Sequence, residues 1–225
     1  ILNMDVFKEK GIKFRWFTEN CFEFEFQSGK TLLIDPMLPD VEKSPEWKEF
    51  GSGFTPKDLK RCDYVCITHT HGDHVDSLKE VCDLFNPVVM VHEASVVMLA
   101  KDRDLPIRKM LAYTQPATYD FGDFKISMYP GTHVPTIGDV PYSKFAERFG
   151  GGGMEPTESN IFGSCFNTNF MLEVPGGIRI AFVQGEYVPL TKNAFYKSRP
   201  TLLIRQLTLI DRFPEAFDAL IECMD

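Results

Sequence analysis

Four side chains that can bind a metal ion lie close together in this sequence: His69, His71, Asp73 and His74. His69 and His71 are two residues apart at the end of a strand-like apolar run, so their imidazoles project to the same side and can chelate one ion. Asp73 and His74 follow on the next turn, close enough to bind a second ion about 3.5–4 Å from the first. Histidine nitrogen with carboxylate oxygen suits Zn²⁺ and also accepts Mn²⁺ or Fe²⁺. The alternative is a chance cluster on a solvated turn, which the density of ligands argues against.

Strand and helix patterns alternate around this cluster. Residues 63–68 form a compact apolar run that predicts a strand, and residues 75–85 have apolar side chains at helical spacing. A strand at 88–91 and a helix at 93–101 follow. This order places the cluster at a strand end, where a sharp turn can direct several side chains toward one point.

The rest of the chain predicts mainly strands. Residues 12–17 and 21–26 alternate with period 2, with phenylalanines on one face of the second run and glutamates on the other, which predicts a half-buried antiparallel hairpin. Further strands are predicted at 31–36, 107–113, 121–129, 167–174, 178–183 and 201–206, and a last helix at 214–224. Two sets of mainly β elements, each finished by α elements, predict an α+β fold in which helices cover a pair of sheets.

The least regular segment runs from residue 131 to 164 and contains four consecutive glycines at 150–153. A loop of this length inside a compact domain is usually functional or disordered. We interpret it as a mobile lid or a disordered segment. A phosphate-binding loop is the alternative, which the lack of a following helix and lysine disfavours.

Composition bounds the class of protein and its partners. With 225 residues, 44% hydrophobic and 25% charged, the chain fits a globular protein of one large domain or two small ones. A net charge of −8 without a basic run makes nucleic acid a poor candidate partner. An uninterrupted apolar stretch long enough to span a membrane is lacking. We therefore expect neither nucleic acid as the main partner nor a membrane span, and a homo-oligomer is compatible with the sequence.

The cysteines and the first residue bear on where the protein works. Six cysteines are scattered without a CxxC pair, which favours a reducing, cytoplasmic location. Cys66, in the run that leads to the cluster, is expected to be a buried small hydrophobe. The chain begins with Ile1 rather than Met, which is compatible with a trimmed or incomplete chain.

The cluster resembles the HxHxDH signature of the metallo-β-lactamase superfamily. More narrowly, the strand end at Asp35-Pro36 and the spacing throughout resemble the small metal-dependent hydrolases related to L-ascorbate-6-phosphate lactonase. The resemblance runs from about residue 12 to the end, and the histidine cluster is its most specific part. It implies one domain over residues 1–225, folded as a four-layer αββα sandwich with the metals at one edge of the two sheets.

The resemblance also implies ligands beyond the first cluster. His133, after a strand, matches the third histidine of the first metal site; the alternative is a surface-loop histidine. Glu186 stands where the family has a bridging Asp, and its extra methylene moves the carboxylate by about 1.5 Å; the alternative is an exposed turn acid. His92, at a strand end, is either a spare ligand or proton donor, or a histidine bonded to backbone.

The last family ligand, a histidine beyond Glu186, has no counterpart among the five histidines of the chain. Two explanations stay open. The second metal site is degenerate, or the chain ends before the strand and loop that would carry the ligand. The predicted helix at 214–224 is the element expected just before that strand, which favours the second explanation.

The resemblance implies a metal-dependent hydrolase, in which a metal-bound hydroxide attacks a carbonyl or phosphoryl centre and Asp73 orients or deprotonates it. Loss of His71 should then abolish both metal content and activity. From the resemblance alone, the expected substrate is a small lactone or a phosphorylated sugar derivative, and the expected cofactor is one or two Zn²⁺ ions. The alternatives are a phosphodiesterase acting on a phospholipid or cyclic nucleotide, and a non-catalytic metal-binding protein with a degenerate second site.

Overall fold

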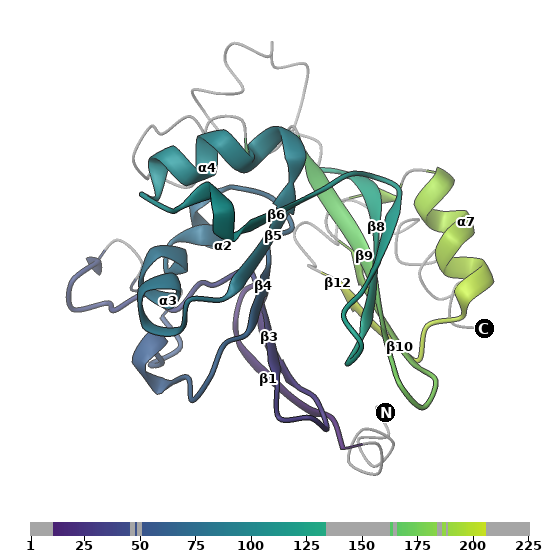
Figure 1. Cartoon of the computed structure of the whole chain (residues 1–225), viewed down its shortest axis with the longest axis horizontal. Helices are drawn as coiled ribbons and strands as arrows, with labels where there is room; N and C mark the ends of the chain where they lie inside the picture. The colour runs from purple at the N-terminus through teal and green to yellow at the C-terminus, as the bar shows by residue number, and fades with distance from the viewer. Residues whose placement is uncertain are drawn as a thin grey trace.

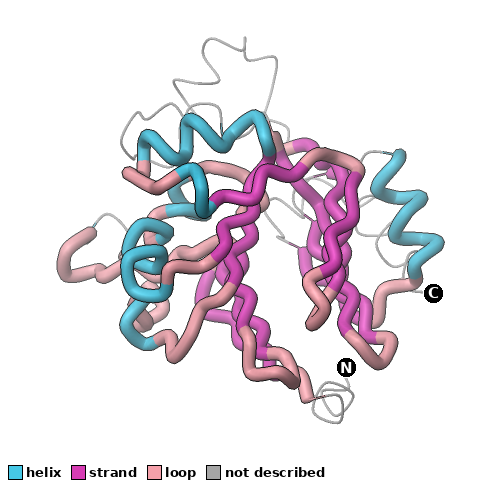
Figure 2. The backbone as a smooth tube through the Cα atoms, in the orientation of Figure 1, coloured by secondary structure: helices cyan, strands magenta, loops and turns pink. Residues whose placement is uncertain are grey.

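The computed structural model describes residues 11–45, 48, 51–133, 163, 166–183, 186–187 and 189–205, and the structural statements below concern these residues. They form two β-sheets that face each other, with helices on the two outer sides (Figure 1). The tube representation shows the strands as two adjacent layers between the helices (Figure 2). The predicted four-layer αββα arrangement is therefore confirmed.

The first sheet has the strand order β1-β2-β3-β4-β5-β6. These strands are β1 Lys13–Thr18, β2 Cys21–Glu25, β3 Thr31–Ile34, β4 Tyr64–Cys66, β5 Val88–His92 and β6 Met110–Tyr113. The first three pair antiparallel, and β3 to β6 run parallel. The carboxyl ends of β3, β4 and β5 consequently lie at one edge of the sheet, and the residues that follow these strands are brought together there.

The second sheet has the order β11-β8-β9-β10-β12, and β7 pairs with β8. Its strands are β7 Ala117–Asp120, β8 Lys125–Thr132, β9 Asn167–Val174, β10 Ile178–Val183, β11 Glu186–Tyr187 and β12 Leu202–Arg205. On the outside, α2 Gly72–Val75, α3 Leu78–Phe85 and α4 Val96–Asp102 cover the first sheet, and α7 Pro189–Ser198 covers the second (Figure 1). Short 3₁₀ helices lie at η2 Pro56–Asp58, η3 Glu93–Ser95 and η4 Ile107–Lys109.

The main hydrophobic core lies between the two sheets and is rich in phenylalanine. Alternation along β2 turns Phe22 and Phe24 inward, where each ring meets the edge of Phe182 from β10, with ring centroids 5.6 and 5.8 Å apart. Such edge contacts are a preferred geometry for aromatic pairs. Glu23 on the opposite face is less exposed than predicted, at 6%, because it accepts a hydrogen bond of 2.6 Å from Arg15. Two further cores fill the spaces under the helices.

Several predicted boundaries were wrong. The predicted helix at 75–85 is two helices, α2 and α3, and the first begins inside the ligand cluster. The predicted strand at 107–113 starts with a 3₁₀ turn, and the one at 121–129 is displaced to β8. The sequence patterns missed β7, β11 and α7 altogether. The predicted helix at 214–224 and the glycines at 150–153 lie outside the described residues.

Cysteine burial and helix length test two smaller predictions. Cys66 is fully buried in the main core, as predicted for a small hydrophobe. Among the described residues, no helix is both long and apolar enough to cross a membrane.

Candidate metal centre

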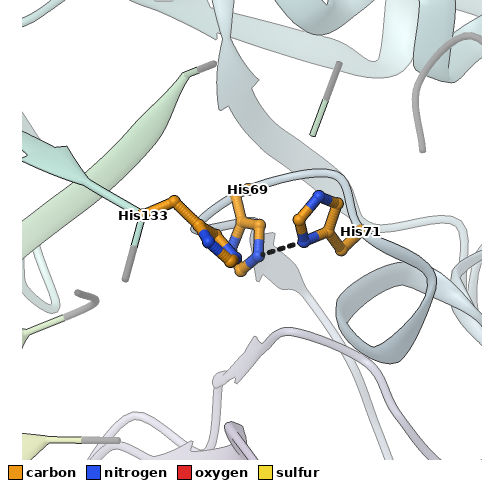
Figure 3. A group of neighbouring side chains, drawn as sticks. All are labelled: His69, His71 and His133. Carbon is orange, nitrogen blue, oxygen red and sulfur yellow. Dashed lines mark hydrogen bonds between the residues drawn. The ribbon is translucent and has the colours of Figure 1, made fainter. Parts of the chain in front are cut away.

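Three histidines from both sheets meet at the edge where β4 and β8 end (Figure 3). His69 and His71 lie in the loop between β4 and α2, and His133 directly follows β8. The Nε2 atom of His69 is 3.1 Å from Nδ1 of His71. One ring nitrogen of each of the three lies within 4.8 Å of the others. We call these residues the three-histidine cluster; the structure brings together the residues that the sequence predicted for the first metal site.

The loop that carries His69 and His71 is fixed by hydrogen bonds from both sheets. Ile67 extends the pairing of β4, because its N–H donates to the carbonyl of Met90 over 2.9 Å. The Tyr113 hydroxyl donates to the carbonyl of Ile67 over 2.8 Å. From the second sheet, the N–H of Thr168 donates to the carbonyl of Thr68 over 3.0 Å. These bonds leave the loop little freedom to move its two histidines.

The start of α2 turns Asp73 and His74 back toward the cluster. His71 is the N-cap residue, with an extended backbone, and the N–H of His74 donates to its carbonyl over 3.0 Å. The ring centroid of His74 is 3.8 Å from that of His69. His74 Nε2 lies 3.7 Å from a carboxylate oxygen of Asp73, whose side chain is 35% exposed. The two residues predicted for a second ion are therefore adjacent to each other and to the first three.

Asp35, which follows β3, holds His74 in place through the Nδ1 atom of its ring. It is fully buried, and its Oδ2 lies 2.7 Å from Nδ1 of His74. The backbone N–H and the hydroxyl of Thr68 also donate to this carboxylate, over 2.7 and 2.5 Å. The Nδ1–H of His74 donates a hydrogen bond to Asp35, and Nε2 is the nitrogen that faces Asp73.

The role of Asp35 was not predicted. Its φ of +41° is unusual for a residue other than glycine, and backbone strain of this kind clusters at functional sites. The sequence signal that could have found it is an acid at the carboxyl end of an apolar strand that is parallel to the strand before the histidines.

The buried histidines differ in electrostatic environment. Burial, followed by the neighbouring His133, lowers the pKa of His71 to about 3. Burial, followed by His74, holds the pKa of His69 well below its ordinary value. Burial alone would also lower the pKa of His74, but the carboxylates of Asp73 and Asp35 outweigh it and raise that pKa to about 9. Around neutral pH, His69 and His71 are thus uncharged and have lone pairs available for a cation.

The three-histidine cluster fits a metal ion better than it fits a purely structural role. Two uncharged imidazoles that place ring nitrogens 3.1 Å apart can share one hydrogen or direct two lone pairs at one cation. The nitrogens that face each other are Nε2 of His69 and Nδ1 of His71, and burial lowers the pKa of both rings. A cation between them would therefore receive a lone pair from each ring.

Comparison with known proteins agrees with this geometry. The sequence model of the metallo-beta-lactamase superfamily matches residues 14–158, more than half of the chain and a range that includes all five histidines. The chain belongs to the metallo-beta-lactamase superfamily. Its fold is that of a member of this superfamily, as the sequence resemblance implied.

Curated relatives within the metallo-beta-lactamase superfamily match part of the chain. A UPF0173 metal-dependent hydrolase of Koribacter versatilis is 26% identical over 131 residues, which cover 58% of this chain and 51% of the relative. Another, of Thermodesulfovibrio yellowstonii, is 35% identical over 142 residues, which cover 60% and 50%. The chain thus spans about half the length of the curated relatives that it matches.

Solved structures support the fold. The isothiocyanate hydrolase from Delia radicum gut bacteria superposes with a TM-score of 0.58 at 15% identity, covering 84% of this chain and 69% of that one. The Zn²⁺-bound PqqB of Methylobacterium extorquens gives a TM-score of 0.55 at 13% identity, covering 95% and 68%. At these identities the likeness concerns the fold alone.

Two other candidate residues, Glu186 and His92, are not among the ligand atoms of the three-histidine cluster in the described residues. The backbone of Glu186 in β11 pairs with Thr132, one residue before His133, so the chain passes beside the cluster; the Glu186 side chain lies outside the description. His92 ends β5, and its Nδ1 accepts a hydrogen bond of 3.2 Å from the N–H of Ala94. His92 therefore follows the alternative prediction of a strand-terminal histidine bonded to backbone, and it lies outside the three-histidine cluster.

Gly163 is a part of the site that sequence reasoning missed. A Cβ atom at this position would lie 2.3 Å from Cδ2 and 2.8 Å from the backbone nitrogen of His71. A glycine is therefore required for the chain to pass against this histidine. The glycine alone gave no signal, because its contact is with a residue far away in the sequence.

Proposed function

We propose that this chain is a metal-dependent hydrolase and that His69, His71 and His133 bind its first metal ion. The observation that carries the proposal is the three-histidine cluster, with ring nitrogens within 4.8 Å of one another at a sheet edge. Three histidines around one ion, with a further position for water or substrate, are typical of catalytic rather than structural zinc sites. Membership of the superfamily and relatives named as metal-dependent hydrolases support the same conclusion.

The donor set favours zinc as the metal. All three donors of the first site are imidazole nitrogens, which suit Zn²⁺ and also accept Mn²⁺ or Fe²⁺. We further propose that Asp73 and His74 bind a second ion and that Glu186 contributes to it. In support, His74 Nε2 and an Asp73 oxygen lie 3.7 Å apart on one turn of α2.

The protein's own residues supply positioning and proton transfer in the proposed reaction. When bound, the ion polarises the scissile bond and brings the pKa of water close to neutral. Asp73, whose side chain is 35% exposed beside His74, orients the attacking water and accepts its proton. Asp35 and Thr68 hold His74 and the loop in place. We propose a small lactone or phosphorylated sugar derivative as substrate, on the sequence resemblance.

A metal count combined with a substrate panel tests this function. Zinc-loaded protein should contain at least one equivalent of zinc and hydrolyse δ-valerolactone or D-glucono-δ-lactone faster than bis(p-nitrophenyl) phosphate. His133→Ala should lose the zinc and the activity together, because two histidines alone bind the ion weakly. His92→Ser is the matched control: it removes a histidine outside the cluster and keeps an oxygen that can cap η3.

Three results would count against the proposal. Turnover by metal-free protein would exclude a metal-dependent reaction. A preference for the phosphodiester would favour a phosphodiesterase. One tightly held zinc ion without any turnover would favour a metal-binding protein.

A further inference from the structure

The turn between β1 and β2 lies at the same sheet edge as the candidate metal centre. It consists of Glu19 and Asn20, between Thr18 and Cys21, which pair with each other. The next pairing places Phe22 of β2 opposite Ile34 of β3, and Asp35 follows directly. The turn is therefore next to the carboxylate that anchors His74.

The backbone of Glu19 has an unfavourable conformation. Its φ is +41°, in the left-handed region that glycine adopts without steric cost and that a glutamate rarely adopts. The indole of Trp16 donates a hydrogen bond of 2.9 Å to the carbonyl of Glu19, which holds the turn in place. A glycine would form the same turn at lower cost, so the sequence has a side chain here that the turn itself does not need.

Asn20 adds a second cost in the same turn. It is 3% exposed, and its Nδ2 atom is buried without an acceptor among the described residues. A strained acid and a buried unpaired amide in two consecutive residues disagree with a turn optimised for stability. Local departures of this kind are expected at functional sites.

The Glu19 carboxyl lies close to the second half of the candidate site. Burial, followed by the negative charge of Asp73, raises the pKa of Glu19, whereas His74 opposes the rise. Glu19 in turn contributes to the raised pKa of His74. These mutual effects agree with the strand pairing, which places the turn beside Asp35 at the same sheet edge. The group of ligand atoms within 4.8 Å of one another contains the three histidines and not Glu19, so the carboxyl borders the site without belonging to that group.

We propose that Glu19 is a substrate-binding residue, whose carboxylate accepts a hydrogen bond from a hydroxyl or ammonium donor on the substrate. A partly buried carboxylate, on a turn that Trp16 fixes at the sheet edge of the candidate metal centre, is suited to this role. A substrate with a donor near the scissile bond would then be preferred over one without. The inference rests on the proposed function, because it names the substrate class of the same site.

Paired substrates and a charge-neutral variant test the inference. In zinc-loaded protein, D-glucono-δ-lactone is compared with δ-valerolactone, and homoserine lactone with γ-butyrolactone. Because a hydrogen bond to a charged group contributes a factor of about ten or more, Glu19→Gln should lower kcat/KM about tenfold for the lactone that carries the donor. The loss for the plain lactone should be smaller, because that substrate has no donor for the carboxylate to bind, and the zinc content should stay at the wild-type value. A loss of kcat/KM confined to the gluconolactone pair indicates a hydroxyl donor, and one confined to the homoserine lactone pair indicates an ammonium donor. An equal loss for the two lactones within each pair, or no loss, overturns the proposal.

Glu19→Gly separates binding from a structural role. Removing the strained side chain should raise Tm by about 2–4 °C, while discrimination between the paired lactones falls as in Glu19→Gln. A rise in Tm with discrimination intact means that Glu19 is a strained turn residue without a part in binding.

The proposed function and this inference fail in different ways. If the wild type hydrolyses neither lactone of a pair, the proposed function fails, and calorimetric binding of D-gluconate and of homoserine then tests the inference. Tighter binding of either compound by the wild type than by Glu19→Gln supports the role of Glu19. Equal binding, or none, overturns it.

Discussion

His71 and His74 are three residues apart and both buried, yet the pKa of His71 lies below the ordinary value of histidine and that of His74 lies above it. His71 lies in the three-histidine cluster, where burial and a neighbouring histidine lower its pKa to about 3. His74 lies in what we call the acidic corner, formed by Glu19, Asp35, Asp73 and His74, where carboxylates overcome burial and raise the pKa to about 9. Burial is common to both, so the neighbouring groups decide in which direction each pKa is shifted.

The three-histidine cluster and the acidic corner have different roles in the site. Uncharged imidazoles in the cluster keep lone pairs for a cation, which must come from outside the chain. The acidic corner already contains opposite charges and a connected set of hydrogen bonds through Asp35. We therefore expect loss of the fully buried Asp35 carboxylate to reduce folding stability and substitutions around the cluster to reduce metal affinity.

The largest effect is expected from Asp35→Asn. The carboxylate is fully buried and accepts bonds from Thr68 and His74, so removing its charge leaves the other member of a buried pair uncompensated. Breaking such a pair costs about 3–5 kcal/mol. Urea unfolding followed by circular dichroism should show a large drop in the free energy of unfolding.

Asp73→Asn is the matched control for Asp35→Asn. Its side chain is 35% exposed, and its nearest oxygen lies 3.7 Å from His74 Nε2, farther than a hydrogen bond, so its loss should cost less than the loss of the fully buried Asp35. This variant should remain nearly as stable as the wild type while hydrolysis falls. Equal unfolding midpoints for the two variants would show that Asp35 does not anchor the corner.

A smaller effect is expected from Gly163→Ala, on the cluster side of the comparison. The new methyl group would approach the His71 ring to 2.3 Å, so the ring or the chain must move. Because displacing buried groups in this way costs about 1–3 kcal/mol, zinc affinity should fall by about tenfold or more. A competition titration with a zinc chelator measures it.

Gly177→Ala is the control for Gly163→Ala, because it makes the same substitution away from His71. No atom lies within 4 Å of a Cβ at Gly177, but its φ is +87°. This variant should lower stability through backbone strain and leave zinc affinity unchanged. If both alanine variants lose zinc equally, contact with His71 is not the cause.

The sequence predicted those parts of the molecule whose signals are local. The run before His69 predicted a strand, and alternation along residues 21–26 predicted that the phenylalanines share one face. The strands predicted at 167–174 and 178–183 match β9 and β10. His69 and His71 were paired from spacing. His133 was placed only through the family resemblance, since it comes from the other sheet.

The missed parts depend on contacts between distant residues or on weak patterns. Asp35 is 33 residues from Thr68 and 39 from His74, and only the parallel pairing of β3 with β4 brings them together. The ten residues of α7 have a weak apolar stripe, and β11 is two residues long. Neither has a periodicity that a single sequence can reveal.

The smallest effect is expected from Tyr113→Phe, which removes a hydrogen bond at the strand end that leads to both regions. The Tyr113 hydroxyl is 2.8 Å from both the Ile67 carbonyl and the Thr168 hydroxyl. Thr168 also accepts a bond from Gln115, so the substitution removes the partner of Ile67 while Thr168 keeps one. A single lost bond of this kind costs about 1 kcal/mol, which urea unfolding can resolve.

Zinc affinity of Tyr113→Phe then decides whether the two regions are independent. The hydroxyl braces the strand end just before His69, but the link from Thr168 to Thr68 still holds that loop to the second sheet. We therefore expect zinc affinity to stay at the wild-type value. Tyr119→Phe, whose hydroxyl accepts one exposed bond from Thr114, should change neither quantity. A loss of zinc affinity in Tyr113→Phe would mean that the stability of the loop and the geometry of the cluster are coupled, and the division between corner and cluster would not hold.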